Sequence, residues 1–213
     1  MPLYTTDALI LRSYKLGESD RIVVFLTRDR GKKRGVARNA RQSRRRFGGA
    51  LEPLTCGRVA YMERERRDLV RVDYVEQTRS PMSAVDGEAL GYAGYFAELI
   101  DEWAQEADPN ETLFRLGVSM TDAIAAGVPI EPLARYFEFW LLRLQGVYEA
   151  APQLSAEARA FLTMARSSSP FALSRVAVSR VALRELEGAH RALMTMHLEK
   201  DLKSVRVLKE MRR

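Results

Sequence analysis

Cysteine and histidine are scarce in this sequence of 213 residues, and their scarcity limits the chemistry open to it. Cys56 is the single cysteine, so the chain can form no internal disulfide and no thiolate metal cluster. Glu187 and His190 have the Glu-x-x-His spacing of carboxylate-bridged metal centres. Those centres need a second such pair on another helix, which the two histidines of this chain do not supply. We therefore expect no metal site and no cofactor.

Motifs that accompany catalysis are also missing. Residues 167–169 are three serines outside a Gly-x-Ser-x-Gly turn. Gly31-Lys32 lacks the upstream glycine and the following hydroxyl residue of a Walker loop. Glu18 and Asp20 could hold magnesium for a nuclease, but no converging set of carboxylates accompanies them. We expect a protein that is not an enzyme and takes no small-molecule substrate, and we keep a nuclease as an alternative to test.

Long hydrophobic runs are absent as well. No stretch approaches the roughly 18 apolar residues that span a bilayer. Asp7 stands where a secretory signal would carry positive charge. These features favour a cytoplasmic protein without a membrane partner.

Positive charge is abundant, and it is concentrated in one place. The net charge of +6 combines a balance of +9 over residues 1–80 with −3 over the remainder. Residues 28–46 contain ten Lys or Arg and a single acid, Asp29. Such a stretch cannot be buried in a core and must face water or a polyanion. A solvated loop that only aids solubility would carry interspersed acids, so the pattern favours nucleic acid as the partner.

The first 79 residues have the pattern of short strands. Apolar runs separated by polar or glycine-containing breaks cover residues 4–14, 21–27, 32–37, 57–62 and 69–75. Gly31 predicts a hairpin turn with positive φ before the third run, whose basic residues we expect to point outward. A polar connector over residues 63–68 joins the last two runs. Five short strands predict a small antiparallel barrel, because closing a sheet leaves no exposed edge.

The chain after residue 80 has helical periodicity instead. Helices are expected over residues 84–107, 108–127, 132–146, 155–166 and 179–202, with a shorter one after residue 204. Asp108 is predicted as the N-cap of the second helix, with Pro109 at its first helical position. Ser155 is placed to cap the fourth. We therefore expect two domains, a β domain over residues 1–79 and an all-α domain over residues 80–213.

Several short motifs follow one another along both parts. They are Leu16-Gly17-Glu18-Ser19-Asp20, Val36-Ala37-Arg38-Asn39-Ala40-Arg41, Phe47-Gly48-Gly49-Ala50-Leu51-Glu52-Pro53, Arg135-Tyr136-Phe137-Glu138, Leu141-Leu142-Arg143-Leu144-Gln145-Gly146 and Leu202-Lys203-Ser204. In this order the chain resembles the RecO family of bacterial recombination mediators. The expected fold is then α+β and multidomain, with a five-stranded antiparallel OB-fold barrel followed by a helical domain.

The sequence departs from the family pattern in two places. Many members carry a four-cysteine zinc module after the helix that ends here at Gly146, and this chain has no cysteine there. Asn39 stands where the family usually has glycine. Asparagine tolerates the left-handed conformation better than other residues with a side chain, so we expect a tight turn with positive φ at this position.

The candidate DNA-binding residues are the cations of the basic stretch. We expect phosphate contacts without sequence preference from Lys32, Lys33, Arg34, Arg38, Arg41, Arg44, Arg45 and Arg46. Aromatic side chains could add base stacking, although most aromatics in a domain of this size belong to its core. The five available are Tyr14, Phe25, Phe47, Tyr61 and Tyr74. Phe47 is followed by Gly48-Gly49-Ala50-Leu51, which suggests that it anchors the chain back onto the barrel.

The resemblance also implies partners. The helical domain of such proteins docks the acidic, hydrophobic C-terminal tail of single-strand-binding protein, which needs an apolar pocket rimmed by Arg or Lys. Arg135 is the candidate, and a surface arginine with a local ion pair is the alternative. The family further implies RecR as a partner, loading of RecA, annealing of complementary strands and a place near the bacterial nucleoid. The basic stretch is also compatible with an alternative interpretation, in which the protein is an RNA-binding or translation-associated barrel protein.

Overall fold

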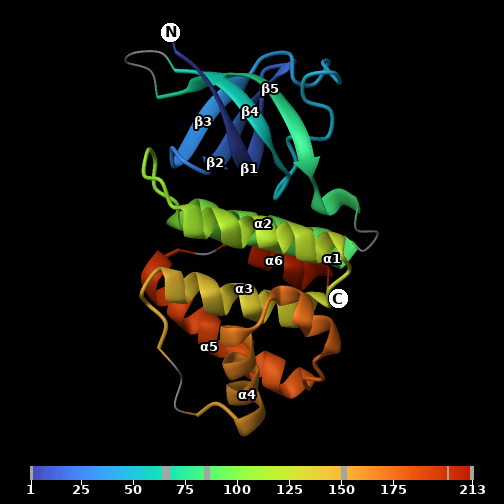
Figure 1. Cartoon of the computed structure of the whole chain (residues 1–213), viewed down its shortest axis with the longest axis vertical. Coiled ribbons are helices and arrows are strands. Elements are labelled where there is room, and N and C mark those ends of the chain that lie inside the picture. The colour runs from blue at the N-terminus through green and yellow to red at the C-terminus, as the bar shows by residue number, and fades with distance from the viewer. Residues whose placement is uncertain (1, 64–67, 84–86, 150–152, 201, 212–213) are drawn as a thin grey trace.

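The computed structural model describes residues 2–63, 68–83, 87–149, 153–200 and 202–211. A five-stranded barrel lies at one end of the molecule, and helices form the other (Figure 1). The strands are β1 (Leu3–Leu16), β2 (Asp20–Thr27), β3 (Lys32–Ala37), β4 (Cys56–Met62) and β5 (Val70–Arg79). The change from strand to helix falls between Arg79 and Pro81, where the sequence predicts it. Residues 64–67 of the predicted connector lie outside the described residues.

The strands close on themselves in the order β1-β2-β3-β5-β4, with β4 returning to β1. Four of these pairings are antiparallel, but β3 and β5 run parallel over three residue pairs. The expectation of a purely antiparallel barrel was therefore wrong. Parallel neighbours need a long crossover, and the segment between them, which includes β4, provides it. Gly35 permits the approach, since a Cβ there would lie 2.7 Å from the Cγ2 atoms of Val70 and Val72.

Strand β1 pairs with its two neighbours along different parts of its length. Its first half pairs with β4 and its second half with β2, and the register shifts between Ile10 and Arg12. Side chains alternate across a strand, so Ala8 and Ile10 enter the barrel core while Leu9 and Leu11 pack against the helices. Burial on both faces explains the unbroken apolar run at this point of the sequence.

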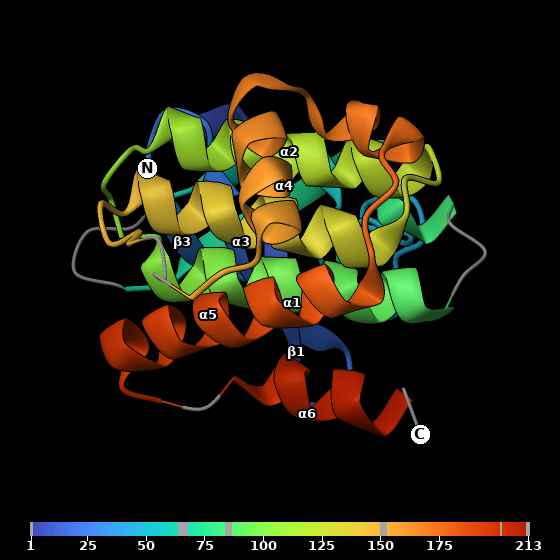
Figure 2. The same ribbon diagram turned by 90° about the horizontal axis from the view of Figure 1, so that it is seen from below.

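Six α-helices and two short 3-10 helices are present among the described residues. They are η1 (Pro81–Ser83), α1 (Gly87–Trp103), α2 (Glu111–Ala125), α3 (Ile130–Leu144), α4 (Ala156–Ser167), η2 (Pro170–Arg175), α5 (Arg180–Leu198) and α6 (Lys203–Met211). The barrel rests on α1 and α2, and Figure 2 shows α5 and α6 along one side of the helical layer. Among the described helices, none combines the length and apolar character needed to cross a membrane.

The start of α2 corrects one prediction. Asn110, not Asp108, is the N-cap, and its side-chain oxygen accepts a hydrogen bond of 2.9 Å from a backbone N–H in the first turn. The reason is a tertiary contact between β3 and the residues before α2. The backbone N–H of Lys32 donates to the Gln105 carbonyl (3.1 Å), and the N–H of Ala107 donates back to the Lys32 carbonyl (3.3 Å). This pairing with β3 holds residues 105–107 out of the helix and delays its beginning.

The predicted starts of the fourth and fifth helices were confirmed. Ser155 caps α4, and Ser179 caps α5, each accepting a hydrogen bond of 3.2 Å from a backbone N–H in its helix. The third helix begins two residues before Pro132, at Ile130. The predicted helical residues 84–86 lie outside the described residues, as do 150–152, in the region where the family resemblance places a zinc module.

Candidate nucleic-acid interface

The segment that follows β3 is fixed to the β1–β2 turn. Asn39 has φ of 54°, as predicted, and its backbone N–H donates to the Asp20 carboxylate at 2.8 Å. Arg41 adds two hydrogen bonds to the same turn, from its backbone N–H to the Ser19 carbonyl (3.1 Å) and from its guanidinium to the Glu18 carbonyl (2.7 Å). We call residues 38–47 the arginine loop. These contacts hold it in place without using its other arginines.

Phe47 anchors the far end of the arginine loop. Its ring is 2% exposed and packs in the barrel core, which confirms the anchoring suggested by the residues that follow it. The carbonyl of Arg46 accepts a hydrogen bond from the backbone N–H of Val75 (3.0 Å). The Arg46 guanidinium lies over the Phe47 ring and donates to the carbonyl of Arg38 (2.7 Å) and the hydroxyl of Ser43 (3.1 Å). Arg46 was predicted to be exposed, but it is half-buried because its side chain closes the loop.

Two lysines of the predicted set are already paired. Lys32 donates to the Asp101 carbonyl (2.6 Å) and pairs with its carboxylate (3.2 Å). Lys33 pairs with Glu63 at 2.8 Å. Both side chains are mostly covered, with 16% and 17% exposed. The outward orientation predicted for them was wrong, since each reaches a carboxylate that lies far away in sequence.

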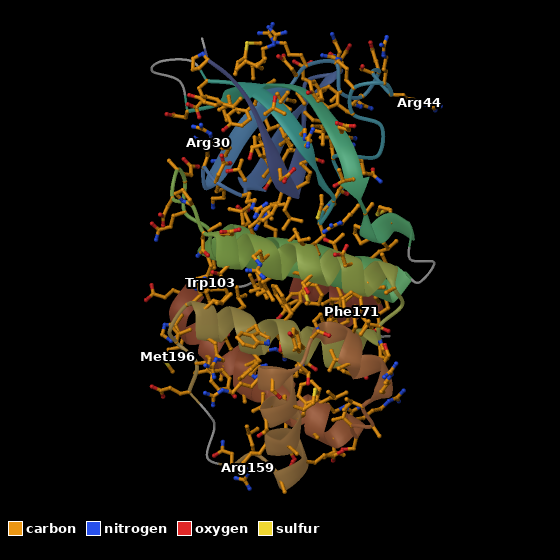
Figure 3. The ribbon with its side chains drawn as sticks, in the orientation of Figure 1. Arg30, Arg44, Trp103, Arg159, Phe171 and Met196 are labelled. Atoms are coloured by element: carbon orange, nitrogen blue, oxygen red, sulfur yellow. The ribbon has the colours of Figure 1, made fainter. Side chains whose placement is uncertain are left out.

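The remaining four arginines form an unneutralised group. Arg34, Arg38, Arg44 and Arg45 are exposed, and within the described part of the chain their guanidinium groups have no ion pair or hydrogen bond. Figure 3 shows Arg44 reaching outward beside the barrel, at the opposite end of the molecule from Arg159. Three of these free positive charges lie on the hydrogen-bonded loop and the fourth, that of Arg34, lies on β3, so that together they offer a preformed surface for a polyanion.

The aromatic candidates divide by burial. Phe25, Phe47 and Tyr61 are at most 2% exposed and fill the barrel core, whereas Tyr14 and Tyr74 are 43% and 40% exposed. Burial raises the pKa of Tyr61 to about 12. The two exposed rings are therefore the candidates of this set that a nucleobase can reach.

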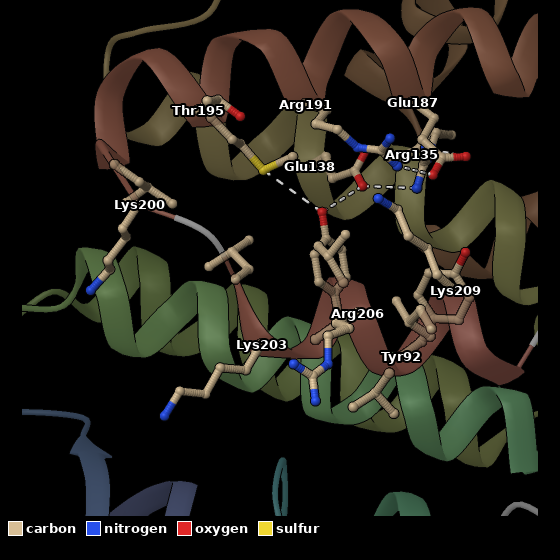
Figure 4. Close-up of a pocket in the computed structure, with 17 residues that line it drawn as sticks. Tyr92, Arg135, Glu138, Glu187, Arg191, Thr195, Lys200, Lys203, Arg206 and Lys209 are labelled. Carbon is tan, nitrogen blue, oxygen red and sulfur yellow. Dashed lines mark hydrogen bonds and ion pairs between the residues drawn. The ribbon is translucent and has the colours of Figure 1, made fainter.

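A pocket in the helical part contains the other predicted residue, Arg135. It measures about 720 Å³ and lies between α5 and α6, over α1 and α3 (Figure 4). Its apolar lining includes Tyr92, Tyr95, Met194, Leu198, Leu202, Val205, Val207 and Leu208. Lys203 and Lys209 are exposed at its α6 wall and have no ion pair among the described residues. The pocket thus combines an apolar interior with free positive charge.

Arg135 itself lies in the floor of this pocket and not at its rim. It is 4% exposed and pairs with Glu138 at 2.8 Å. Glu138, 1% exposed, also accepts from the Tyr95 hydroxyl (2.9 Å) and contacts Nδ1 of His190 (3.0 Å). Burial alone would raise the pKa of Glu138, but the Arg135 charge and the hydrogen bonds from His190 and Tyr95 outweigh it and lower the pKa. Among the described residues, Nε and Nη1 of Arg135 make no hydrogen bond, although Nη1 lies 3.5 Å from a carboxylate oxygen of Glu187.

Glu187 and His190 do not converge as the Glu-x-x-His spacing would need. His190 turns to Glu138, while Glu187 pairs with Arg191 (2.5 Å) and Arg135 (3.5 Å). Within the described ranges, no group of three or more His, Cys, Asp or Glu side chains is placed to hold a metal ion.

One feature that the sequence did not reveal links the two parts of the molecule. Glu98, Asp101 and Glu102 on α1 together contact Arg12 of β1, at distances between 2.8 and 3.6 Å. Glu98 also accepts hydrogen bonds from the backbone N–H groups of Lys203 (3.2 Å) and Ser204 (2.7 Å), and so caps α6. In the sequence these three carboxylates are spaced i, i+3 and i+4, which places them on one face of a helix. That spacing could have predicted that they share a cationic partner.

Sequence comparisons agree with this architecture. The family described as Recombination protein O N terminal matches residues 1–81, and the family described as Recombination protein O C terminal matches residues 84–149.

Proteins named DNA repair protein RecO are similar to this chain over much of its length. The one from Koribacter versatilis is 44% identical over 145 residues, 68% of this chain and 59% of that protein. The one from Anaeromyxobacter sp. (strain K) is 43% identical over 153 residues, or 71% and 59%. The one from Geobacter metallireducens is 39% identical over 142 residues, or 66% and 57%. The matched region spans about three fifths of each of these relatives.

Proposed function

This chain belongs to the RecO family, and we propose that it acts in DNA repair and recombination by binding single- and double-stranded DNA without sequence preference. The supporting observation is that Arg34, Arg38, Arg44 and Arg45 have no ion pair among the described residues, and that three of them lie on a loop held at both ends. Contacts from such residues go to phosphates, which give affinity and no sequence selectivity. The names of the relatives support the repair role.

The chemistry proposed is binding and not bond cleavage. Two complementary strands repel each other, and a protein that neutralises phosphates on both lowers that repulsion and lets them anneal. The family resemblance adds cooperation with RecR to load RecA onto strands coated by single-strand-binding protein. Work on DNA of this kind would place the protein with the nucleoid in the bacterial cytoplasm.

The pocket beside α6 supports a second part of the proposal, docking of the acidic C-terminal tail of single-strand-binding protein. Apolar side chains of the tail would fill the cavity of about 720 Å³. Carboxylates would meet Lys203 and Lys209 at the wall, and in the floor Nε of Arg135 makes no hydrogen bond among the described residues. Because Glu138 already neutralises Arg135, we assign the main electrostatic attraction to the two lysines.

The DNA-binding proposal is tested by fluorescence anisotropy with labelled single strands, duplexes and an RNA of matched sequence. Binding to both DNA forms, with RNA no better a competitor, is the expected result. A strong preference for RNA would favour the alternative of an RNA-binding protein, since a contact to the 2′-hydroxyl selects RNA over DNA. Loss of labelled DNA in magnesium buffer would instead identify a nuclease.

The pocket is tested separately with a fluorescent peptide of the tail. The double variant Lys203→Glu/Lys209→Glu should bind it at least tenfold more weakly, because two attractive contacts become repulsive. Arg159→Glu/Arg166→Glu on α4 makes the same change of charge at a distance. Equal affinity of both variants for the peptide would remove the pocket from the proposal.

A further inference from the structure

Tyr14 occupies an outer face of the barrel that the helices leave open. In the strand register, Tyr14 of β1 pairs with Ile22 of β2, which pairs with Val36 of β3. Ile22 and Val36 are half-buried, and the Tyr14 ring is 43% exposed. The next row towards the helices is Arg12, Val24 and Arg34, and there Val24 is buried against α-helical residues. The first row is thus an apolar strip with an accessible aromatic ring at one end.

The free arginines lie close to this strip. Arg34 is two residues from Val36 on the same face of β3, which corresponds to roughly 7 Å along the strand. Tyr14 and Val36 are two strand spacings apart, or roughly 10 Å. The arginine loop is hydrogen-bonded to Glu18 and Ser19 in the turn after β1 and to Asp20 at the start of β2. Tyr14 and the cations therefore belong to one continuous end of the barrel.

Tyr74 has almost the same exposure but a different setting. It lies on β5 next to Asp73, and Glu76 follows two residues later. The nearby Arg71 pairs with Asp73 at 3.0 Å. Glu76 has no ion pair among the described residues and repels a phosphate backbone. Carboxylates also lie near Tyr14, whose hydroxyl is 3.5 Å from Arg12, but they are paired with Arg12, Lys32 and Lys200. Exposure alone therefore does not make Tyr74 a contact for DNA. It serves instead as a matched control.

We infer that Tyr14 stacks on an unpaired nucleobase of DNA held by the free arginines, and that it lets the protein distinguish single strands from duplexes. The inference rests on the DNA-binding function proposed above and adds a site to it. A base that leaves the stack exposes a flat π-face, which an exposed tyrosine ring can cover. Ile22 and Val36 supply apolar surface beside it. In a duplex the bases are already stacked, so Tyr14 contributes to single-strand binding alone.

For annealing, the contact to Tyr14 would favour binding of the single-stranded reactants over binding of the duplex product. A single strand has both the phosphate contacts and the contact to Tyr14, whereas the annealed product has the phosphate contacts only. The product is then held less tightly than the reactants at this site, and the protein releases it. Stacking on one aromatic side chain strengthens binding by roughly 5- to 150-fold, which sets the size of the preference expected from Tyr14.

The test compares Tyr14→Ala, Tyr14→Phe and Tyr74→Ala of the full chain by anisotropy, with an oligo-dT strand and a duplex of equal length. Tyr14→Ala should lose at least fivefold in affinity for the single strand, with unchanged duplex affinity and unchanged salt dependence. Tyr14→Phe keeps the ring and should bind as the wild type does, as should Tyr74→Ala. Circular dichroism and thermal unfolding confirm that the variants are folded.

A second readout uses Tyr14→Trp, whose indole fluorescence should be quenched by oligo-dT and not by the duplex. If Tyr14→Ala binds single strands like the wild type, or loses single-strand and duplex binding equally, the stacking site is wrong while the arginine surface stands. If the wild type binds neither form, the DNA-binding proposal fails and the stacking site fails with it. A quench by single strands together with selective loss in Tyr14→Ala supports both.

Discussion

Replacing Arg44 and Arg45 with alanine removes two of the four free arginines and breaks no side-chain hydrogen bond or ion pair among the described residues. Both side chains are exposed, and no hydrogen bond or ion pair of theirs is present in the described residues. The free energy of unfolding should therefore change by no more than about 0.5 kcal/mol. DNA affinity should change far more, because these residues are proposed to meet phosphates.

The magnitude follows from counterion release. Each neutralised phosphate on a single strand contributes about −0.7 to the slope of log K against log salt. Four contacts predict a wild-type slope near −3, and two contacts leave about −1.4 in the variant. The electrostatic contribution to log K vanishes near 1 M salt. The variant should therefore bind the single strand roughly 25-fold more weakly than the wild type at 0.1 M salt.

The assay is anisotropy with a labelled single strand at several salt concentrations. The matched control is Arg159→Ala/Arg166→Ala, which lowers the net charge equally on α4, at the other end of the molecule (Figure 3). The control should keep the wild-type slope. An Arg44/Arg45 variant with the wild-type slope would refute the assignment, and equal losses in both variants would show that only net charge matters.

Three further substitutions probe how the loop and the pocket are built. Arg46→Ala should cost about 1–2 kcal/mol of unfolding free energy in urea denaturation, because the hydrogen bond to the Arg38 carbonyl and the ring contact are lost; an unchanged midpoint would show that the loop does not need them. Phe47→Ala should cost about 3–5 kcal/mol by leaving a cavity in the barrel core, and a loss below 1 kcal/mol in the same assay would contradict the anchor. Glu138→Gln should cost about 3–5 kcal/mol at pH 7, because the buried charge of Arg135 loses its partner at 2.8 Å and keeps only the longer ion pair to Glu187 at 3.5 Å. The pKa of Glu138 is lowered from the ordinary 4.5, so its carboxylate stabilises the wild type above that pH and the contribution is lost as pH falls below it. The variant should therefore lose less stability than the wild type between about pH 6 and pH 3, and parallel pH profiles would argue against a charged Glu138.

Local pattern predicted much of the fold, for physical reasons that individual residues show. Alternation and glycine placement located all five strands, and the turn residues Gly31 and Asn39 take the positive φ expected of them. The parallel pairing of β3 with β5 could not be predicted in this way, because side-chain alternation is the same in parallel and antiparallel strands. Asp108 failed as a helix cap for a related reason, since backbone pairing with Lys32 decides where that helix begins.

The candidate site was predictable as a region but not residue by residue. Charge density identified the basic stretch, and its composition could not show that Lys32 meets Asp101 or that Lys33 meets Glu63. Arg135 was singled out by resemblance, yet its burial against Glu138 depends on the packing of α3. A cation that is free and one that is internally paired look alike in a sequence, and only the fold separates them.

Annealing of complementary strands tests the central claim most directly, namely that this protein brings DNA strands together through its arginine surface. Two labelled complementary oligonucleotides are mixed in buffer with EDTA, and duplex formation is followed by quenching with the wild type, Arg44→Ala/Arg45→Ala and Arg159→Ala/Arg166→Ala. Faster annealing with the wild type and the α4 control, and a rate close to that of DNA alone with the loop variant, is the predicted result. Equal acceleration by all three proteins, or none by the wild type, would contradict it.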